Sequence, residues 1–332
     1  MNTFYLFPCV VLLSCLAHAQ NSVFDLGQCR SVTLSDEVRV TCLHVNFTRL
    51  PIKSFPSNTT NLNLSYSNLS SITLDDLKLL SDLRDLSLVK NQLRSLPADL
   101  LNGLSNLQLL DLTGNNLSAL PLRVFHPSPL VELTLADNLL SEIDVDCLPV
   151  NNSLQRLDLS FNRFTQLPVS LLQRLGNLES LDLKGNQLEE LRPGGLNSLS
   201  KLEALYLENN KLKSLDVSVF SGNPNLRQLF LGNNRLETLP AGLFSKQVQL
   251  VFLDLGNNYL QSVTPGVLDG HLFGVFSGNP WHCNSSLAYL WHWLHKNENR
   301  LFHFNEVTCQ SPEHMKGRNI TELADTELAR LK

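Results

Sequence analysis

Residues 83–93 read LRDLSLVKNQL, and residues 107–117 read LQLLDLTGNNL. Both stretches carry leucine at the first, fourth, sixth and eleventh places and asparagine at the ninth. The asparagine returns at intervals of 23 or 24 residues, at Asn91, Asn115, Asn138, Asn162, Asn186, Asn210, Asn234 and Asn258. A degenerate first copy precedes this series and contains Leu62, Leu64, Ser67 and Leu69. Nine such units predict a solenoid, because each unit can bury its apolar face only against its neighbours.

Within each unit the leucines at the fourth and sixth places alternate with other residues, which predicts a short strand with both leucines pointing inward. Successive strands should form a parallel sheet on the concave face of a horseshoe, so the expected fold class is an α/β solenoid. A second column of large apolar residues should form the outer wall of the core: Leu77, Leu101, Phe125, Leu148, Leu172, Leu196, Phe220, Phe244 and Leu268. The asparagine lies where the chain turns inward, and its amide can bond backbone groups that this turn buries.

Both ends of such a stack expose apolar core and unpaired strand edges, so each end needs a cap. Residues 29–61 should form the first cap, with a leading strand that contains Val38, Val40 and Leu43. Residues 272–317 should form the second. A helix is expected there, because apolar residues recur at helical spacing at Leu287, Leu290, Trp291 and Leu294.

The amino terminus reads as a secretory signal. Phe4 to Leu16 is apolar and is followed by Ala17-His18-Ala19, an A-x-A cleavage site, although no Lys or Arg stands near the start. A buried amino-terminal strand is the alternative. The predicted organisation is a signal peptide (1–19), a cap (20–61), nine repeats (62–271) and a second cap with a tail (272–332). We therefore expect a secreted, soluble protein that begins near Gln20, with no glycolipid anchor.

Five cysteines remain after the predicted signal. In an oxidising compartment, their positions near the two ends favour the pairs Cys29–Cys42 and Cys283–Cys309. Cys147 is left over, in a repeat position that other units fill mostly with apolar residues. A buried inert thiol is the favoured interpretation, and an intermolecular disulfide or a reactive thiol is the alternative.

Glycosylation is expected, because N-x-[ST] sequons begin at Asn46, Asn58, Asn63, Asn68, Asn116, Asn151, Asn284 and Asn319. Four of them precede residue 70, so sugar should shield the amino-terminal end. The formal net charge of −5 excludes a broadly basic nucleic-acid binder, and no apolar run is long enough to span a membrane as a helix.

The side chains that flank the inward leucines should point to the concave face. Tyr206 and Phe230 fall on adjacent strands with Phe252 on the next, which is the composition of an interface hot spot. Ordinary cross-strand packing is the competing interpretation. Acidic residues on neighbouring strands would favour a basic partner, although aspartate here could simply keep the face soluble: Asp85, Asp111, Glu132, Asp158 and Asp182. The candidate contacts are Asp111, Asp158, Asp182, Tyr206, Phe230 and Phe252.

No motif supports catalysis, since the chain lacks G-x-S-x-G and H-E-x-x-H. His292 and His295 lie one turn apart on the expected cap helix, with His282 and His303 near in sequence, but a metal site would need a third ligand and a second shell. A solvated helix face is the better interpretation. Carboxylates on separate flat strands make a poor calcium cage. We expect neither an enzyme nor a metal or cofactor.

The second cap is the most specific motif. Its residues Asn279-Pro280-Trp281-His282-Cys283, Trp293-Leu294, Cys309-x-x-Pro312 and Lys316-Gly317, with Leu-Pro pairs such as Leu96-Pro97, resemble the leucine-rich alpha-2-glycoprotein family of secreted leucine-rich repeat proteins. The resemblance covers about residues 29–320. It includes the reduction to two cysteines in each cap, with Ser285 where many relatives carry a further cysteine. Cys147 departs from the family pattern.

The resemblance implies a non-enzymatic plasma protein that binds cytochrome c and modulates transforming growth factor beta signalling through endothelial receptor components. No binding residues carry over from it. The expected function is therefore protein binding on the concave face, with no nucleic-acid or membrane partner. The alternative is an extracellular matrix proteoglycan-like organiser or a stabilising subunit of a secreted complex. No acidic Ser-Gly-rich segment for glycosaminoglycan attachment is evident.

Overall fold

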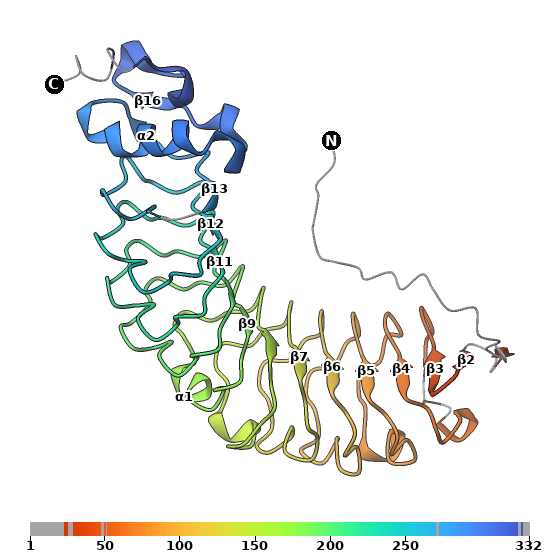
Figure 1. The fold of residues 1–332 in the computed structure, drawn as a ribbon. Coiled ribbons are helices and arrows are strands. Elements are labelled where there is room, and N and C mark those ends of the chain that lie inside the picture. Colours follow the sequence, from red (N-terminus) through yellow and green to blue (C-terminus); the bar gives the residue numbers. More distant parts are fainter. Residues whose placement is uncertain are drawn as a thin grey trace.

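The computed structural model describes residues 23–25, 29–47, 50, 52–269, 272–324 and 327. The predicted signal peptide and the end of the predicted tail lie outside these residues. The described chain forms a horseshoe whose strands line the inner side of the bend, with turns on the outer side (Figure 1). The predicted fold class is confirmed: a long parallel sheet, few helices and a disulfide near each end.

One fourteen-stranded sheet runs along the horseshoe. Its strands are, in spatial order, β1 (Val23–Asp25), β2 (Arg30–Leu34), β3 (Glu37–Thr41), β4 (Asn61–Asn63), β5 (Asp85–Ser87), β6 (Leu109–Asp111), β7 (Glu132–Thr134), β8 (Arg156–Asp158), β9 (Ser180–Asp182), β10 (Ala204–Tyr206), β11 (Gln228–Phe230), β12 (Phe252–Asp254), β13 (Phe273–Val275) and β15 (Leu301–Phe302). The first three strands pair antiparallel, and from β3 onward every pairing is parallel. A separate pair joins β14 (Trp281–His282) to β16 (Cys309–Ser311).

Helices are short and lie in the connections. The α-helices are α1 (Val169–Leu172) and α2 (Ala288–Lys296). Single 3₁₀ turns occupy Ile52–Ser54, Leu74–Asp76, Val145–Cys147, Ser285–Leu287, Glu298–Arg300, Phe304–Glu306, Glu313–Met315 and Ile320–Glu322. A 24-residue unit is too short for a long helix on its outer side, so turns close most repeats.

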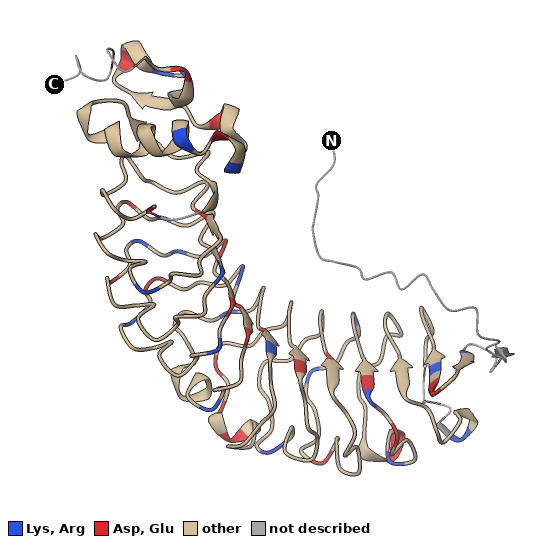
Figure 2. Cartoon of the chain, in the orientation of Figure 1, with Lys and Arg blue, Asp and Glu red and all other residues tan. Residues whose placement is uncertain are grey.

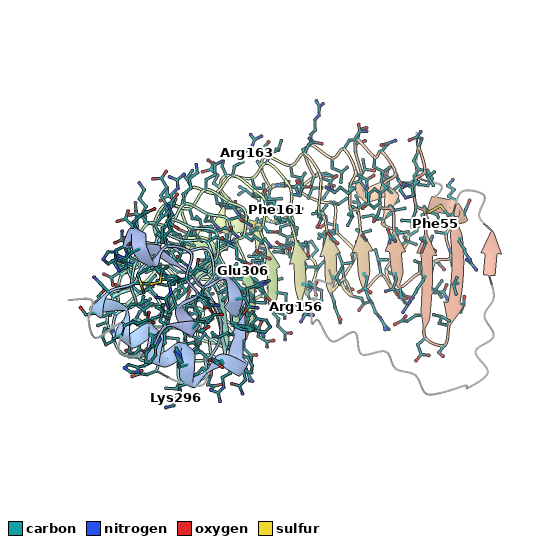
Figure 3. All side chains as sticks on the ribbon, turned by 90° about the horizontal axis from the view of Figure 1, so that it is seen from above. Phe55, Arg156, Phe161, Arg163, Lys296 and Glu306 are labelled. Atoms are coloured by element: carbon teal, nitrogen blue, oxygen red, sulfur yellow. A yellow bond between two sulfur atoms is a disulfide. The ribbon has the colours of Figure 1, made fainter. Side chains whose placement is uncertain are left out.

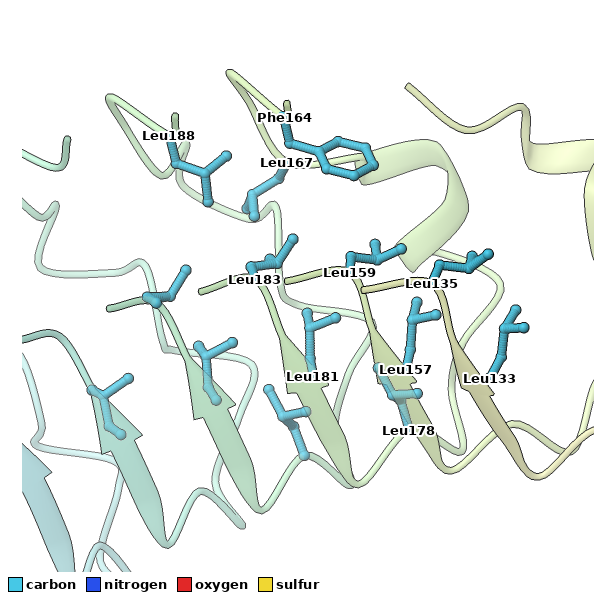
Figure 4. Packing of buried hydrophobic residues seen from close by; sticks show 14 of the residues in the cluster. Leu133, Leu135, Leu157, Leu159, Phe164, Leu167, Leu178, Leu181, Leu183 and Leu188 are labelled. Atoms are coloured by element: carbon cyan, nitrogen blue, oxygen red, sulfur yellow. The ribbon is translucent and has the colours of Figure 1, made fainter. Parts of the chain in front are cut away.

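The parallel register places equivalent leucines in rows. Leu133, Leu157 and Leu181 are partners on neighbouring strands, and each is buried. Figure 4 shows them projecting to the same side as Leu135, Leu159 and Leu183. The outer-wall column is buried as predicted except at Phe244, which is half-buried and packs beside Phe220 with ring centroids 6.1 Å apart.

A buried asparagine closes each repeat after the first, in which Ser67 takes its place. The Asn162 amide nitrogen donates to the carbonyls of Leu135 at 2.8 Å, Leu159 at 3.2 Å and Ser160 at 3.1 Å, and its oxygen accepts from the Leu140 backbone N–H at 3.0 Å. Its donors therefore bond both its own turn and the preceding repeat. Asn279 makes equivalent bonds to Leu255 and Leu260, so the ladder continues into the second cap beyond the predicted column.

The caps follow the prediction with one correction. Cys29–Cys42 joins the residue before β2 to the residue after β3, and Cys283–Cys309 joins the residue after β14 to the first residue of β16. The predicted face of α2 is buried. However, Leu43 was wrongly predicted in the leading strand: β3 ends at Thr41, and Leu43 is 44% exposed. The inward positions are Val38, Val40 and Cys42, so Leu43 falls in the outward phase of the alternation.

We expect Asn162→Leu to lower the free energy of unfolding by about 2 to 4 kcal/mol, because leucine has a similar volume but leaves the buried Leu140 N–H and Leu135 carbonyl unbonded. Urea denaturation would measure the change. Asn102→Ala is the control, because Asn102 is exposed. It should change the free energy of unfolding by less than about 0.5 kcal/mol. Equal effects from the two variants would contradict a structural role for the ladder.

Cys147 is a free thiol with 1% of its surface exposed, and burial raises its pKa to about 12. This confirms the buried position. Since the thiolate is the reactive form, native protein should resist alkylation by iodoacetamide, whereas denatured protein should take up one alkyl group per chain at Cys147. Mass spectrometry with and without denaturant would measure this. Rapid native labelling, or a dimer that dissociates only on reduction, would contradict it.

Candidate interface on the concave sheet

Two columns of side chains rise from the concave face, and the strand register aligns each of them. The first column precedes the inward leucine and reads Asn61, Asp85, Leu109, Glu132, Arg156, Ser180, Ala204, Gln228 and Phe252. The second follows the leucine and reads Asn63, Ser87, Asp111, Thr134, Asp158, Asp182, Tyr206, Phe230 and Asp254. All of them are at least partly exposed. The sheet therefore displays these side chains in a fixed order.

The structure brings the three predicted aromatics together. Tyr206 and Phe230 stack with ring centroids 4.6 Å apart and planes 11° apart, and the Phe230 and Phe252 centroids are 4.9 Å apart. Two further rings extend the series. The ring centroid of Phe302 lies 5.7 Å from that of Phe252 and 6.5 Å from that of Phe273. We name these five residues the aromatic row. It crosses β10, β11, β12, β13 and β15.

The repeat spacing does not predict Phe273 and Phe302, because the sequence repeat ends before the second cap. On β13 the inward position is Gly274, in register with Leu253, instead of leucine. A Cβ atom on Gly274 would lie 2.4 Å from the Phe276 ring, so that ring fills the space of the absent leucine. Phe302 comes from β15, which belongs to no repeat. Strands that follow no sequence repeat can be recognised as part of the sheet only once the strand pairing is known.

The aspartates of the second column also support the backbone, a role that residue spacing does not reveal. Asp111, Asp158, Asp182 and Asp254 each accept a hydrogen bond from the backbone N–H two residues on, at 2.8 or 2.9 Å. Each carboxylate therefore supports the turn that follows its strand. Aspartate is favoured at this position whether or not a partner binds.

The predicted acidic residues lie on neighbouring strands, β5 to β9, as the spacing indicated, but they are divided between the two columns. Asp85 and Glu132 lie in the first column, where Asp85 accepts from Asn61 and Glu132 is paired with Arg156 at 2.7 Å. Arg156 is labelled in Figure 3. Asp111 lies on β6, four strands from Tyr206 on β10. Figure 2 accordingly shows acidic and basic positions interspersed along the sheet and the turns.

Close to the aromatic row, acidic side chains do gather. Asp158 and Asp182 are register partners on β8 and β9, and Asp182 is the partner of Tyr206. Burial raises the pKa of Asp182 to about 6, and the negative charge of Asp158 adds to this shift. Burial also raises the pKa of Asp158 and of Asp254.

Glu208, which follows the inward Leu207, completes this group and was not among the predicted residues. Its side chain is 12% exposed, and burial raises its pKa to about 7, with Asp182 and Asp254 adding to the shift. Its Oε2 atom is buried without a hydrogen bond, and the ammonium of Lys184 lies 4.0 Å from Oε1. We name Asp158, Asp182, Glu208 and Asp254 the acidic cluster. One lysine does not neutralise four carboxylates, so the cluster carries net negative charge at neutral pH.

The other predicted sites are dispersed. Of the sequon asparagines, Asn63, Asn284 and Asn319 are half-buried, and the remainder are exposed: Asn46, Asn58, Asn68, Asn116 and Asn151. Asn63 lines a pocket of about 370 Å³ at the amino-terminal end of the concave sheet. Whether any sequon carries sugar stays a prediction.

Two histidines of the second cap contact side chains within the cap. His295 packs against Trp291, and His282 hydrogen-bonds Ser311. Among the described residues, no three His, Cys, Asp or Glu side chains are grouped as metal ligands would be. In the same part of the chain, no helix combines the length and apolar character needed to cross a bilayer.

The sequence profile of the leucine rich repeat family matches residues 81–140, 152–212 and 200–260. These matches cover strands β5 to β12 and include the Tyr206, Phe230 and Phe252 rings. No curated protein matches the chain, and no enzyme family does.

The acidic cluster should make stability depend on pH. A carboxyl group whose folded-state pKa exceeds its unfolded value binds its proton more tightly when folded, so its unfavourable contribution appears as pH rises. For Glu208 this happens between about pH 4.5 and 7. Glu208→Gln should therefore stabilise the protein by about 1 to 2 kcal/mol at pH 8 and by much less at pH 4.5.

Thermal unfolding at both pH values would measure this effect. The exposed Glu142 provides a control in Glu142→Gln, which should behave like the wild type at both. If Glu208→Gln destabilised the protein at pH 8, the Glu208 carboxylate would have to stabilise the fold. That result would contradict the expectation from its burial with Oε2 unbonded.

Proposed function

We propose, from the premise that this chain belongs to the leucine-rich repeat family, that it is a secreted, non-catalytic module that binds a protein partner on its concave sheet. Leucine-rich repeats commonly serve as protein-binding modules. Secretion is supported by the two disulfides, which persist in oxidising compartments, together with the predicted signal sequence and the sequons. The role of the concave face rests on the geometry of this chain.

The aromatic row is the observation that carries the proposal. Its rings are held on adjacent strands of one hydrogen-bonded sheet, so little conformational freedom remains to be lost on docking. Aromatic residues on a rigid surface are the usual anchors of protein interfaces. The partner would therefore bury rings that are already arranged.

Exposure favours an interface over ordinary cross-strand packing. Phe302 is 47% exposed and Phe273 is 40% exposed, although both lie beside a cap that buries other large residues. In the same region Phe276 and Trp281 have no exposed surface. A ring that served only to stabilise the cap would be expected at such buried positions, because apolar surface left in water contributes nothing to the core.

The charge around the row favours a basic partner. The chain carries a formal net charge of −5, and the acidic cluster adjoins Tyr206 and Phe230. A positive surface would be attracted to this region and would relieve the repulsion among its carboxylates. Cytochrome c, which the resemblance of the second cap suggests, has this basic character. The same resemblance suggests endothelial receptor components of transforming growth factor beta signalling as partners.

The double variant Tyr206→Ala/Phe230→Ala tests the site. Removing two stacked anchors should weaken binding of immobilised cytochrome c at least tenfold, measured by surface plasmon resonance. The unfolding temperature should fall by only a few degrees, since such a pair contributes about 0.5 to 1.5 kcal/mol beyond its buried area. Tyr259→Ala, which removes an exposed aromatic outside the row, is the control and should bind like the wild type.

Affinity capture from plasma and from cell surfaces, followed by mass spectrometry, extends the test to partners other than cytochrome c. The wild type and the Tyr259 control should retain a set of proteins that the double variant loses. If the double variant kept every protein that the wild type captures, with unchanged affinity, the aromatic row would not be the binding site.

A further inference from the structure

We infer that the face of the Tyr206 ring turned away from Phe230, with the carboxylates of Asp158 and Asp182 beside it, receives an arginine side chain of the partner. This inference rests on the proposed function and adds the chemistry of one contact within it. It predicts a guanidinium stacked on the ring and hydrogen-bonded to carboxylate oxygen.

The orientation of Tyr206 follows from the stacking. Its centroid lies 4.6 Å from that of Phe230, with planes nearly parallel. This separation matches the spacing of neighbouring strands, about 4.8 Å, so the rings stack across the strands. One face of Tyr206 therefore covers Phe230 on β11, and the opposite face is turned toward β9.

The β9 side of Tyr206 carries short side chains. Asp182 is the register partner of Tyr206, and Ser180 is that of Ala204 in the first column. Among the described residues, Phe230 provides the ring contact of Tyr206 and β9 provides none. The aromatic row thus ends at Tyr206 with a π face that no other ring covers.

Negative charge gathers beside this face. One oxygen of Asp182 accepts from the Lys184 backbone N–H at 2.8 Å, and no donor in the described residues bonds the other. Asp158 stands next to it in register. Burial raises the pKa of the Tyr206 hydroxyl, and the negative charges of Asp182 and Glu208 add to that shift. A cation placed here would meet the ring face and two carboxylates together.

The chain's own basic groups near this point leave the place beside Tyr206 unfilled. Arg156 is paired with Glu132 at 2.7 Å. The charge of Lys184 acts on Asp182 and Asp254 as well as on Glu208, but among the described residues its ammonium comes within 4.0 Å only of Oε1 of Glu208. His303 interacts electrostatically with Asp254, which lies on β12, on the side of Phe230 away from Tyr206. The partner is therefore the expected source of the cation.

The shape of the site favours guanidinium over ammonium. A guanidinium is planar, so it can lie flat on the open ring face while its edge donates to carboxylate oxygen. An ammonium is compact and strongly hydrated, and it can satisfy only one of these contacts well. Arginine peptides should consequently bind better than lysine peptides of the same charge.

Fluorescence anisotropy with a labelled hexa-arginine peptide, at pH 7.5 and low ionic strength, tests the inference. Asp182→Asn retains an oxygen for the Lys184 N–H but removes the charge, and it should weaken binding about fivefold or more. Asp111→Asn is the matched control because Asp111 supports its turn in the same way but lies four strands from Tyr206. It should weaken binding less than about twofold.

Further variants separate the ring from the charge. Tyr206→Phe keeps the π face and should bind like the wild type, whereas Tyr206→Leu should lose about threefold or more. A hexa-citrulline peptide, which has a similar shape without charge, should not bind measurably. Lowering the pH to 5 should weaken hexa-arginine binding to the wild type more than to Asp182→Asn, because Asp182 takes up a proton near pH 6.

Three results would overturn the inference: equal losses from Asp182→Asn and Asp111→Asn, equal binding of hexa-lysine and hexa-arginine, or no loss in Tyr206→Leu. Failure of the proposed function would give results that differ from these three. If Tyr206→Ala/Phe230→Ala still captured every partner, the interface itself would be wrong. If that double variant lost its partners while Asp182→Asn kept them at full affinity, the interface would stand without an arginine subsite.

Discussion

The buried asparagine amide at the end of each strand is the constraint on which the structure depends. A solenoid must turn its chain inward once per repeat, and this turn takes backbone N–H and C=O groups out of water. An amide is short and offers both donors and an acceptor, so it can satisfy its own turn and the neighbouring repeat together, as Asn162 does. The repeats are thereby held at one spacing and in one register, and the leucines pack in rows beneath the sheet.

Register is what turns a repeated sequence into an ordered surface. Because every strand aligns with the next, residues 24 positions apart become neighbours, and a change in one repeat alters one point of the concave face. Tyr206 and Phe230 stack for this reason, as their equivalent positions lie one strand apart. Asp158 and Asp182 are forced together by the same alignment, although their charges repel each other.

The concave face therefore combines favourable and unfavourable contacts in one place. The aromatic row stabilises the sheet modestly, whereas the acidic cluster opposes folding at neutral pH because its carboxylates are partly withdrawn from water. Glu208 illustrates the balance, since its carboxylate is buried with one oxygen unbonded and a single lysine nearby. A surface of opposite charge would relieve the repulsion among these carboxylates.

The sequence alone determined the repeat, the inward leucines, the asparagine ladder, both disulfide pairs and the face of α2, because each depends on spacing along the chain. It also placed Tyr206, Phe230 and Phe252 on one surface, since strand period and repeat period together define a column. Tertiary structure decided the rest. Phe273 and Phe302 join the aromatic row only through strand pairing in a cap where the period fails. The burial of Glu208 and the turn-supporting bonds of the aspartates depend on distances between atoms in space, which residue spacing does not encode.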